Sequence, residues 1–447
     1  MQFLLLSEER MRKRAFSDME EKIVINGGIP LRGSVSISGF KNAALPIIVA
    51  TVLTADVCVL ENIPAIRDVE KALEILSAMG AKVKMLGRTT VEIDTKNLEC
   101  GTSPAQLVSK LRGSTYLIGA ELGRFGRAHV GWPGGCDIGN RPIDQHIKAF
   151  EALGATVTTD NGYIDVIAEN GTKGNSIYFD TTSVGATANS ILAAVFAEGT
   201  TIIENPAKEP HIVDLANFLN TCGANISGAG TDVIKIKGVE KLHGCTYSII
   251  PDMIEAGTFM IAAAATGGRV RVDGVIPKHM DCLTAKLQEM GVMVEEIDDS
   301  LIVSCPNRPE KTNVKTLPYP GFPTDLQPQI ATLLCLSDGV SRVTETVFEN
   351  RFKYVDELQK MGAKVRVDGK TAIIEGVEQL YGANLTAIDL RAGAAMVIAG
   401  LAASGTTSVF NIGSIQRGYD NIVEKLRGLG ADIKKVYVNP AENVAIS

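Results

Sequence analysis

The chain has 447 residues, of which 45% are hydrophobic and 21% are charged, as in soluble globular proteins large enough for two or more domains. The formal net charge is −7, which excludes an overall electrostatic attraction to nucleic acid or to anionic lipid. Any anionic substrate must therefore be held by a local cluster of basic groups.

The ends and the cysteines favour a reducing, cytoplasmic compartment. The apolar run over residues 1–6 is too short for a signal peptide, and no stretch approaches the about 18 apolar residues of a membrane span. Residues 1–18 are predicted to be a disordered extension. The eight cysteines are scattered without a C-x-x-C pair, which argues against a zinc site and a disulfide framework. Most of them are expected to be small buried side chains.

A unit of about seventy residues recurs six times along the chain. Segments such as LSAMGAKV (76–83) and LRGLGADI (426–433) share a glycine that follows a helical pattern and precedes a short strand. These glycines are predicted to end their helices in the left-handed conformation. They lie 68 to 74 residues apart, at Gly80, Gly154, Gly223, Gly291, Gly362 and Gly430.

Each unit also contains a helix that is apolar on nearly all sides and rich in Ala and Gly, and we expect these helices to be buried. They are predicted over 41–54, 111–122, 183–199, 252–268, 324–339 and 389–405. Their polar residues lie in the first turn, where free N–H groups favour an anionic ligand. These residues are Lys41 with Asn42, Arg112, Ser183, Asp252, Asp325 and Arg391.

Helix capping is the alternative explanation for these polar residues, and for Ser183 it is the favoured one. For Lys41 and Arg391 capping is a poor explanation, because the helix dipole disfavours a cation at this end. Their positions require an anion.

Residues 131–146, GWPGGCDIGNRPIDQH, form a loop with Cys136 at its centre. A glycine-rich loop with one cysteine is typical of a mobile lid. Arg124, Arg127 or Arg141 could stabilise a thiolate there. The alternative is that Cys136 is an incidental loop thiol, whereas Cys58 and Cys335 lie in apolar runs that favour core packing.

Taken together, these motifs resemble those of the UDP-N-acetylglucosamine 1-carboxyvinyltransferases, which are enolpyruvyl transferases. The resemblance runs from about Met19 to the C-terminus. It rests on KNAALP (41–46), LRGS (111–114), PGGC-x-IG-x-RPIDQH (133–146), SVGAT (183–187), EPHIVDLANFL (209–219), PD-x-IEAGT (251–258), P-x-D (323–325), ENRF (349–352), DLRAGAA (389–395) and RGY (417–419). At Met253 many members of this family have arginine, and Thr181 and Thr182 also depart from the family pattern.

The resemblance implies an α/β fold, a two-domain inside-out α/β barrel with three repeat units in each domain and the substrate cleft between them. Residues 19–40 with 251–447 are expected to form one domain, and residues 41–250, which carry the Cys136 loop, the other. A monomer is favoured, with the oligomeric state left open.

The resemblance also implies the reaction and its residues. The 3-hydroxyl of UDP-N-acetylglucosamine adds to C2 of phosphoenolpyruvate, C3 takes a proton, and phosphate leaves, in the first committed step of peptidoglycan precursor synthesis. Cys136 is the expected acid, Asp325 the expected base and Lys41 a further catalytic residue. The expected substrate-binding residues are Asn42, Arg112, Arg141, Asp144, Ser183, Val184, Gly185, Val347, Arg351, Arg391 and Arg417. No metal or organic cofactor is expected, because positioning and electrostatics carry such a reaction.

Three alternatives remain. The first is enolpyruvyl transfer to shikimate 3-phosphate, which the cysteine loop disfavours. The second is a non-catalytic paralogue that binds UDP-sugar. The third is an RNA-end-processing protein, which the acidic composition disfavours.

Overall fold

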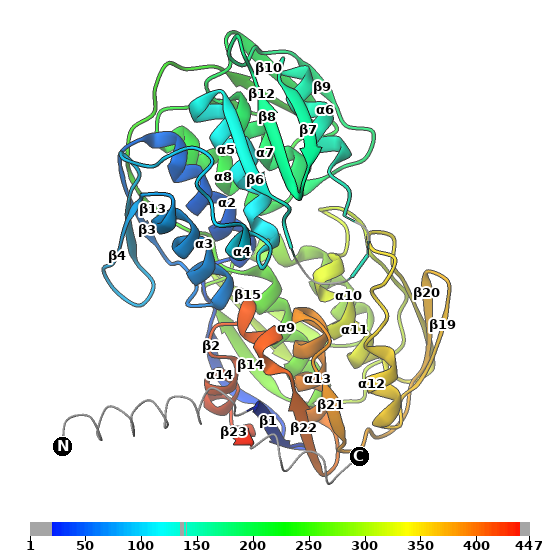
Figure 1. The fold of residues 1–447 in the computed structure, drawn as a ribbon. Helices are drawn as coiled ribbons and strands as arrows, with labels where there is room; N and C mark the ends of the chain where they lie inside the picture. The colour runs from blue at the N-terminus through cyan, green and yellow to red at the C-terminus, as the bar shows by residue number, and fades with distance from the viewer. Residues whose placement is uncertain (1–19, 135–137, 140, 439–447) are drawn as a thin grey trace, which may run out of the picture.

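The computed structural model describes residues 20–134, 138–139 and 141–438. Figure 1 shows the elements of this α/β protein in two groups. The first group runs from α2 to β13 and lies in the upper part of the view, and the second contains β1, β2 and everything from α9 to β23. The predicted extension over residues 1–18 lies outside the described residues.

Three small sheets belong to the first group, and two of them have a parallel strand at one edge beside antiparallel neighbours. The third has three antiparallel strands. In spatial order the sheets are β13 (Thr246–Ser248), β3 (Val57–Glu61), β5 (Val91–Asp94), β4 (Lys82–Met85); β11 (Asn225–Ser227), β12 (Val233–Lys237), β10 (Thr200–Glu204), β9 (Ser176–Tyr178); and β6 (Arg127–Gly131), β8 (Tyr163–Ile167), β7 (Thr156–Asp160).

The second group has three four-stranded sheets, and each again has one parallel edge strand. Strands from both ends of the described chain share the first of them. They are β21 (Asn384–Thr386), β22 (Thr406–Phe410), β1 (Glu20–Asn26), β23 (Asp432–Val438); β15 (Met293–Ile297), β16 (Ser300–Ser304), β14 (Arg269–Asp273), β2 (Arg32–Ser36); and β17 (Val314–Lys315), β18 (Val340–Thr344), β20 (Thr371–Glu375), β19 (Lys364–Asp368).

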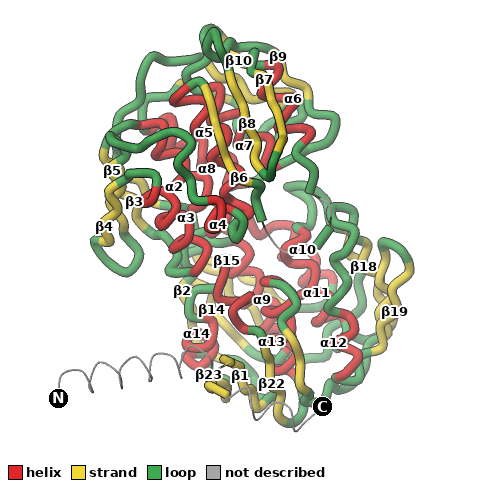
Figure 2. The backbone as a smooth tube through the Cα atoms, viewed as in Figure 1, coloured by secondary structure: helices red, strands yellow, loops and turns green. Residues whose placement is uncertain are grey.

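The six predicted apolar helices are present, and nearly all their residues are buried. They pack on one another within their own group, and Figure 2 shows strands around them. They are α2 (Lys41–Ala50), α5 (Tyr116–Phe125), α7 (Val184–Ala194), α9 (Met253–Ala265), α11 (Gln327–Leu334) and α13 (Leu390–Ala402). The other helices are α3 (Arg67–Ala78), α4 (Ala105–Val108), α6 (Asp144–Ala152), α8 (Pro210–Thr221), α10 (Asp281–Glu289), α12 (Val355–Lys360) and α14 (Ile422–Gly428).

The glycine prediction is confirmed. All six recurring glycines follow a helix and have φ between +77° and +102°, which only glycine adopts without strain. Two helix starts differ from the prediction, because Arg112 and Asp325 lie on short 3₁₀ turns, Arg112–Thr115 and Thr324–Leu326, that precede α5 and α11.

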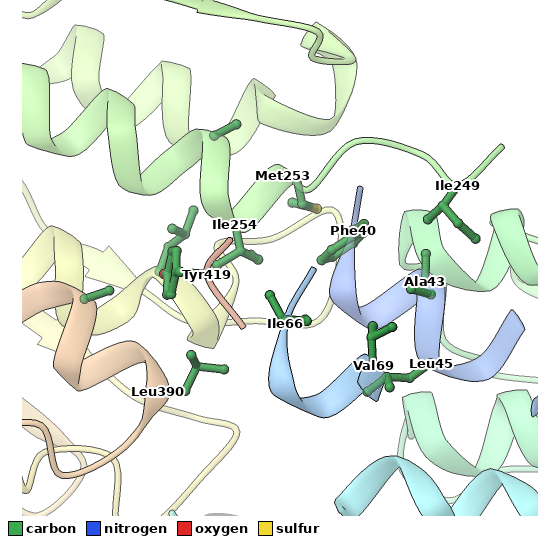
Figure 3. Packing of buried hydrophobic residues seen from close by; sticks show 14 of the residues in the cluster. Phe40, Ala43, Leu45, Ile66, Val69, Ile249, Met253, Ile254, Leu390 and Tyr419 are labelled. Carbon is green, nitrogen blue, oxygen red and sulfur yellow. The ribbon is translucent and has the colours of Figure 1, made fainter. Parts of the chain in front are cut away.

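The two groups of elements are joined where the chain crosses between them. Gly39 pairs with Pro251, and the Phe40 amide donates to the carbonyl of Ile250 at 2.8 Å. Figure 3 shows apolar side chains from both groups at this junction, with Phe40 beside Met253 and Ile66 near Ile254. Met253 is 6% exposed and contributes to this apolar packing.

Burial of the cysteines agrees in part with the prediction. Cys58, Cys222, Cys305 and Cys335 are buried, whereas Cys100, Cys245 and Cys282 are partly exposed. Within the described ranges no helix combines the length and apolarity needed to cross a lipid bilayer.

Candidate active site

Lys41 begins α2, and its ammonium forms a buried ion pair with Asp68. The distance from Nζ to Asp68 Oδ2 is 2.8 Å, and the Asp68 side chain is only 2% exposed. Arg417 holds the same carboxylate from the other group of elements, through Nε at 2.9 Å and Nη2 at 3.2 Å. Burial alone would raise the pKa of Asp68, but the two cations lower it below its usual value. Asp68 thus supplies the anion that the cation at this helix start required.

Asp325 is held between two buried arginines. Arg391 donates to Oδ2 through Nη2 at 3.0 Å and Nε at 3.2 Å, and Arg351 donates to Oδ1 at 3.3 Å. Burial acts to raise the pKa of Asp325, but Arg391, Arg351 and Lys41 outweigh it and hold that pKa far below its ordinary value. Asp325 is therefore a carboxylate in this arrangement, with 26% of its side chain exposed.

The capping explanation for Asp325 does not describe its contacts. The residue before its 3₁₀ turn, Pro323, makes no side-chain cap, and the Thr324 hydroxyl donates instead to Glu345. By contrast, Ser183 accepts a hydrogen bond from the Ala186 amide at 3.3 Å, so its favoured capping role is confirmed. Asp252 likewise caps α9 through the amides of Ile254 and Glu255.

These ion pairs belong to one cluster. Burial lowers the pKa of Lys41, and the positive charges of Arg391 and Arg417 lower it further against the opposing effect of Asp68. The Lys41 amide also contacts Asp252 at 3.4 Å. Four of the six predicted helix starts, those at Lys41, Asp252, Asp325 and Arg391, therefore meet at the junction of the two groups.

The remaining two helix starts, at Arg112 and Ser183, belong to a second set of contacts in the first group of elements. Arg112 donates to the carbonyl of Arg141 at 2.7 Å. The Arg141 guanidinium lies 5.1 Å from the centre of the Phe348 ring, which belongs to the other group of elements. Burial and the charge of Arg141 both lower the pKa of Arg112, so this pair of cations is also suited to an anion.

His146 connects the second set to the start of α7. Its Nδ1 lies 2.9 Å from the Asn189 amide nitrogen. A Cβ atom at Gly185 would lie 3.0 Å from the imidazole, so glycine is what permits this approach. Burial and, next, Arg112 lower the pKa of His146 to about 4 although Asp144 opposes them. The imidazole is therefore neutral at pH 7.

This shift predicts a loss of stability in acid. Because the folded state holds the pKa of His146 below the ordinary 6.5, protonation favours unfolding as the pH falls from about 6.5 toward 4. We expect the unfolding free energy of the wild type to fall by about 2 kcal/mol more than that of His146→Gln between about pH 7 and pH 4.5, measured by urea denaturation. His243→Gln, at an exposed position, should keep the wild-type dependence, and an unchanged dependence in His146→Gln would contradict the prediction.

The cysteine loop itself is described only at its edges, and Cys136 lies outside the described residues. A Cβ atom at Gly134 would lie 1.7 Å from the Ser109 carbonyl oxygen, and one at Gly139 would lie 2.5 Å from a Glu349 carboxylate oxygen. Gly134 therefore needs to be glycine because it lies against backbone, and Gly139 because its φ of +141° is one that other residues rarely adopt. Arg124 donates to the carbonyls of Val52 and Thr95, which gives it a structural role apart from any thiolate.

The other predicted residues lie at the margins of these contacts. Asn42 is partly exposed in the first turn of α2, and Asp144 begins α6 and accepts from Gln145 at 2.9 Å. Val184 and Gly185 begin α7. Val347 is 39% exposed, and its amide donates to Glu345.

Three participants were missed in the sequence, namely Asp68, His146 and Glu345. Asp68 lies in the first turn of α3, where a carboxylate is commonly explained by the helix dipole. His146 closes the RPIDQH motif, so a closer reading of that motif would have drawn attention to it. No local signal distinguishes Glu345.

Comparison with known proteins gives a consistent assignment. The family model described as EPSP synthase (3-phosphoshikimate 1-carboxyvinyltransferase) matches residues 25–426. UDP-N-acetylglucosamine 1-carboxyvinyltransferase 3 of Caldanaerobacter subterraneus subsp. tengcongensis is 57% identical over 416 residues, which is 93% of this chain and 99% of that protein. UDP-N-acetylglucosamine 1-carboxyvinyltransferase 2 of Clostridium acetobutylicum is 56% identical over the same shares.

Solved structures agree on the fold. The enolpyruvyl transferase NikO from Streptomyces tendae superposes with a TM-score of 0.84 at 28% identity and covers 94% of this chain and all of that one. An EPSP synthase from Acinetobacter baumannii gives a TM-score of 0.71 at 19% identity over 93% of this chain and all of that one, which concerns the fold alone. More than half of the residues of this chain are identical to those of the Caldanaerobacter and Clostridium proteins over nearly its whole length. The chain therefore belongs to the enolpyruvyl transferase family, among the UDP-N-acetylglucosamine 1-carboxyvinyltransferases.

Proposed function

We propose that this protein transfers the enolpyruvyl group of phosphoenolpyruvate to UDP-N-acetylglucosamine, for peptidoglycan precursor synthesis. The observation that carries the choice of acceptor is the 57% identity to a UDP-N-acetylglucosamine 1-carboxyvinyltransferase over almost the whole chain. The EPSP synthase structure shares only 19% identity, so shikimate 3-phosphate is the weaker candidate.

The reaction is proposed to proceed by addition and elimination. The sugar 3-hydroxyl oxygen bonds to C2 of phosphoenolpyruvate as C3 takes a proton. Phosphate then leaves C2 while C3 loses a proton, which restores the double bond. Asp325 takes the hydroxyl proton, and its location among Arg391, Arg351 and Lys41 keeps it ionised for that role. Cys136 is the proposed acid at C3.

The substrate's anionic groups are proposed to bind the cationic cluster. Phosphoenolpyruvate carries a phosphate and a carboxylate, for which arginine offers paired donors and lysine a compact charge. The residues proposed to hold them are Lys41, Arg112, Arg141, Arg351, Arg391 and Arg417. The support is that these cations come from both groups of elements, that Arg141 lies against the Phe348 ring, and that the others already hold a carboxylate or carbonyl oxygen.

The sugar nucleotide is proposed to bind beside the first turn of α7. The residues assigned to it are Asn42, Asp144, Ser183, Val184, Gly185 and Val347. The start of α7 at Val184 supports this placement, because the free N–H groups of a helix start favour an anionic diphosphate.

The two groups of elements are proposed to be the two domains, residues 19–40 with 251–447 and residues 41–250. Each is proposed to hold three copies of one unit of about seventy residues, arranged as an inside-out barrel with the substrates between the domains. In the described residues, six sheets, six buried helices and the six recurring glycines, all of which have positive φ, support this division.

Phosphate release from phosphoenolpyruvate, followed with and without acceptor, tests the function. We expect release that depends on UDP-N-acetylglucosamine and is absent with shikimate 3-phosphate. Release that depends only on shikimate 3-phosphate would overturn the choice of acceptor. No release with either acceptor, together with retained UDP-sugar binding, would indicate a non-catalytic paralogue.

A further inference from the structure

Glu345 is a buried carboxylate that accepts hydrogen bonds from three separate segments. It follows β18 and is 1% exposed. Its Oε1 accepts from the Thr316 hydroxyl at 2.8 Å and from the amides of Val347 at 2.8 Å and Phe348 at 3.2 Å. Its Oε2 accepts from the Thr324 hydroxyl at 2.9 Å. Four donors satisfy the charge so fully that the carboxylate fixes their relative positions.

The Thr324 bond ties Glu345 to the proposed base. Thr324 begins the 3₁₀ turn on which Asp325 lies, and its carbonyl also accepts from Arg351 at 3.2 Å. A side-chain hydrogen bond at the residue before Asp325 limits rotation of the whole turn. The bond therefore helps to set where the Asp325 carboxylate lies.

The two amide bonds tie Glu345 to the edge of the cysteine loop. Val347 and Phe348 lead into a segment whose Asn350 amide donates to the Ile138 carbonyl at 3.2 Å. Phe348 itself lies against the Arg141 guanidinium. The segment over residues 346–350 thus contacts Ile138 and Arg141, which follow Cys136 in the sequence of the loop.

We propose that Glu345 is a positioning residue. Its carboxylate holds both the 3₁₀ turn on which Asp325 lies and the segment over residues 346–350, which contacts the edge of the cysteine loop. This inference rests on the proposed function, since it assigns Glu345 a part in placing the proposed base. Glu345 contacts neither Lys41 nor Arg417, which Asp68 holds independently. Turnover should therefore depend more strongly on Glu345 than phosphoenolpyruvate capture does.

The first test compares Glu345→Ala with Glu345→Gln. The alanine variant should lose about a hundredfold in kcat, as expected of a base displaced by about 1 Å, with a KM for phosphoenolpyruvate within about threefold of wild type. The glutamine variant should recover kcat to within about threefold, because its carbonyl can replace Oε1 and its amide can donate to the rotatable Thr324 hydroxyl. Equal losses in both variants, or wild-type kcat in the alanine variant, would overturn the proposal.

If Glu345→Ala does not fold, a less disruptive pair of variants tests whether Glu345 positions the Asp325 turn. Thr324→Val removes only the bond between Glu345 and the Asp325 turn and should lower kcat about tenfold. Thr332→Val is the control, since Thr332 is fully buried, whereas Thr324 is partly buried, and the Thr332 hydroxyl bonds only to the Pro328 carbonyl of its own helix. The same kcat in both variants would overturn the proposal.

Hydrogen exchange gives a readout that does not need turnover. In Glu345→Ala the Asn350 amide, two residues beyond the last direct contact, should exchange faster than in wild type, while amides of α9 keep their protection. Unchanged exchange at Asn350 would remove the link to the loop. If the wild type lacks UDP-sugar-dependent release, the proposed function fails, and the exchange result still decides whether Glu345 supports residues 346–350.

Discussion

Replacement of Asp325 by asparagine is expected to lower kcat about a thousandfold, within the range of a lost general base. Asparagine keeps the size of the side chain and an oxygen for Arg391, but it cannot take a proton. The KM for phosphoenolpyruvate should stay the same or fall, because Arg391 and Arg351 lose the carboxylate that now holds them. Steady-state kinetics with both substrates measure the two parameters.

The control for this prediction is Asp214→Asn. Asp214 is a more deeply buried carboxyl group that accepts from the Tyr247 hydroxyl at 2.6 Å and the Ile250 amide at 3.3 Å, and none of these contacts involves the cationic cluster. It should keep kcat within about threefold of wild type. An Asp325→Asn enzyme with kcat within about tenfold of wild type would show that Asp325 is not the base.

The environment of Asp325 also says how its basicity is set. A carboxylate whose pKa lies far below the usual range is ionised but accepts a proton weakly. The charges responsible are those of Arg391, Arg351 and Lys41. When an anionic substrate binds these same cations, they lower the pKa of Asp325 less. We therefore infer that phosphoenolpyruvate binding makes Asp325 a stronger base at the moment when a base is needed.

The elements of the fold could be predicted because their signals are local. The buried helices are apolar on all sides, and each recurring glycine carries a backbone conformation that other residues avoid. The two 3₁₀ turns were missed because 3₁₀ and α-helical turns share nearly the same side-chain pattern over three or four residues. The sequence therefore predicted where these two helices begin, but it predicted α-helical first turns where the structure has 3₁₀ turns.

The candidate site could be predicted only in part, because its contacts join distant residues. Arg417 and Asp68 are 349 positions apart, and no periodicity relates them. The cation at Lys41 indicated that an anion was needed, yet sequence alone could not show that the protein supplies it from α3. Glu345 has no motif at all, since its importance comes from donors gathered by three separate segments.

Replacement of Lys41 by alanine is expected to raise the KM for phosphoenolpyruvate about a hundredfold, the effect of losing a charged hydrogen bond of about 3 kcal/mol. Asp68 keeps Arg417 through two hydrogen bonds, so the loss of folding stability should be smaller than for a carboxylate left with no partner. The expected result is a large change in substrate capture with a modest change in melting temperature. Initial rates at varied phosphoenolpyruvate and thermal unfolding measure the two effects.

Lys425→Ala separates substrate capture from the general effect of breaking a buried ion pair. The Lys425 ammonium lies 2.6 Å from Glu255, whose side chain is as buried as that of Asp68. This control should lose at least as much stability as Lys41→Ala but leave the KM for phosphoenolpyruvate near that of wild type. Lys41→Met, which keeps most of the aliphatic stem, should match Lys41→Ala in KM, because the charge and not the packing of the stem attracts the substrate. A wild-type KM in either Lys41 variant would remove Lys41 from the site and leave Asp68 as a purely structural partner of Arg417.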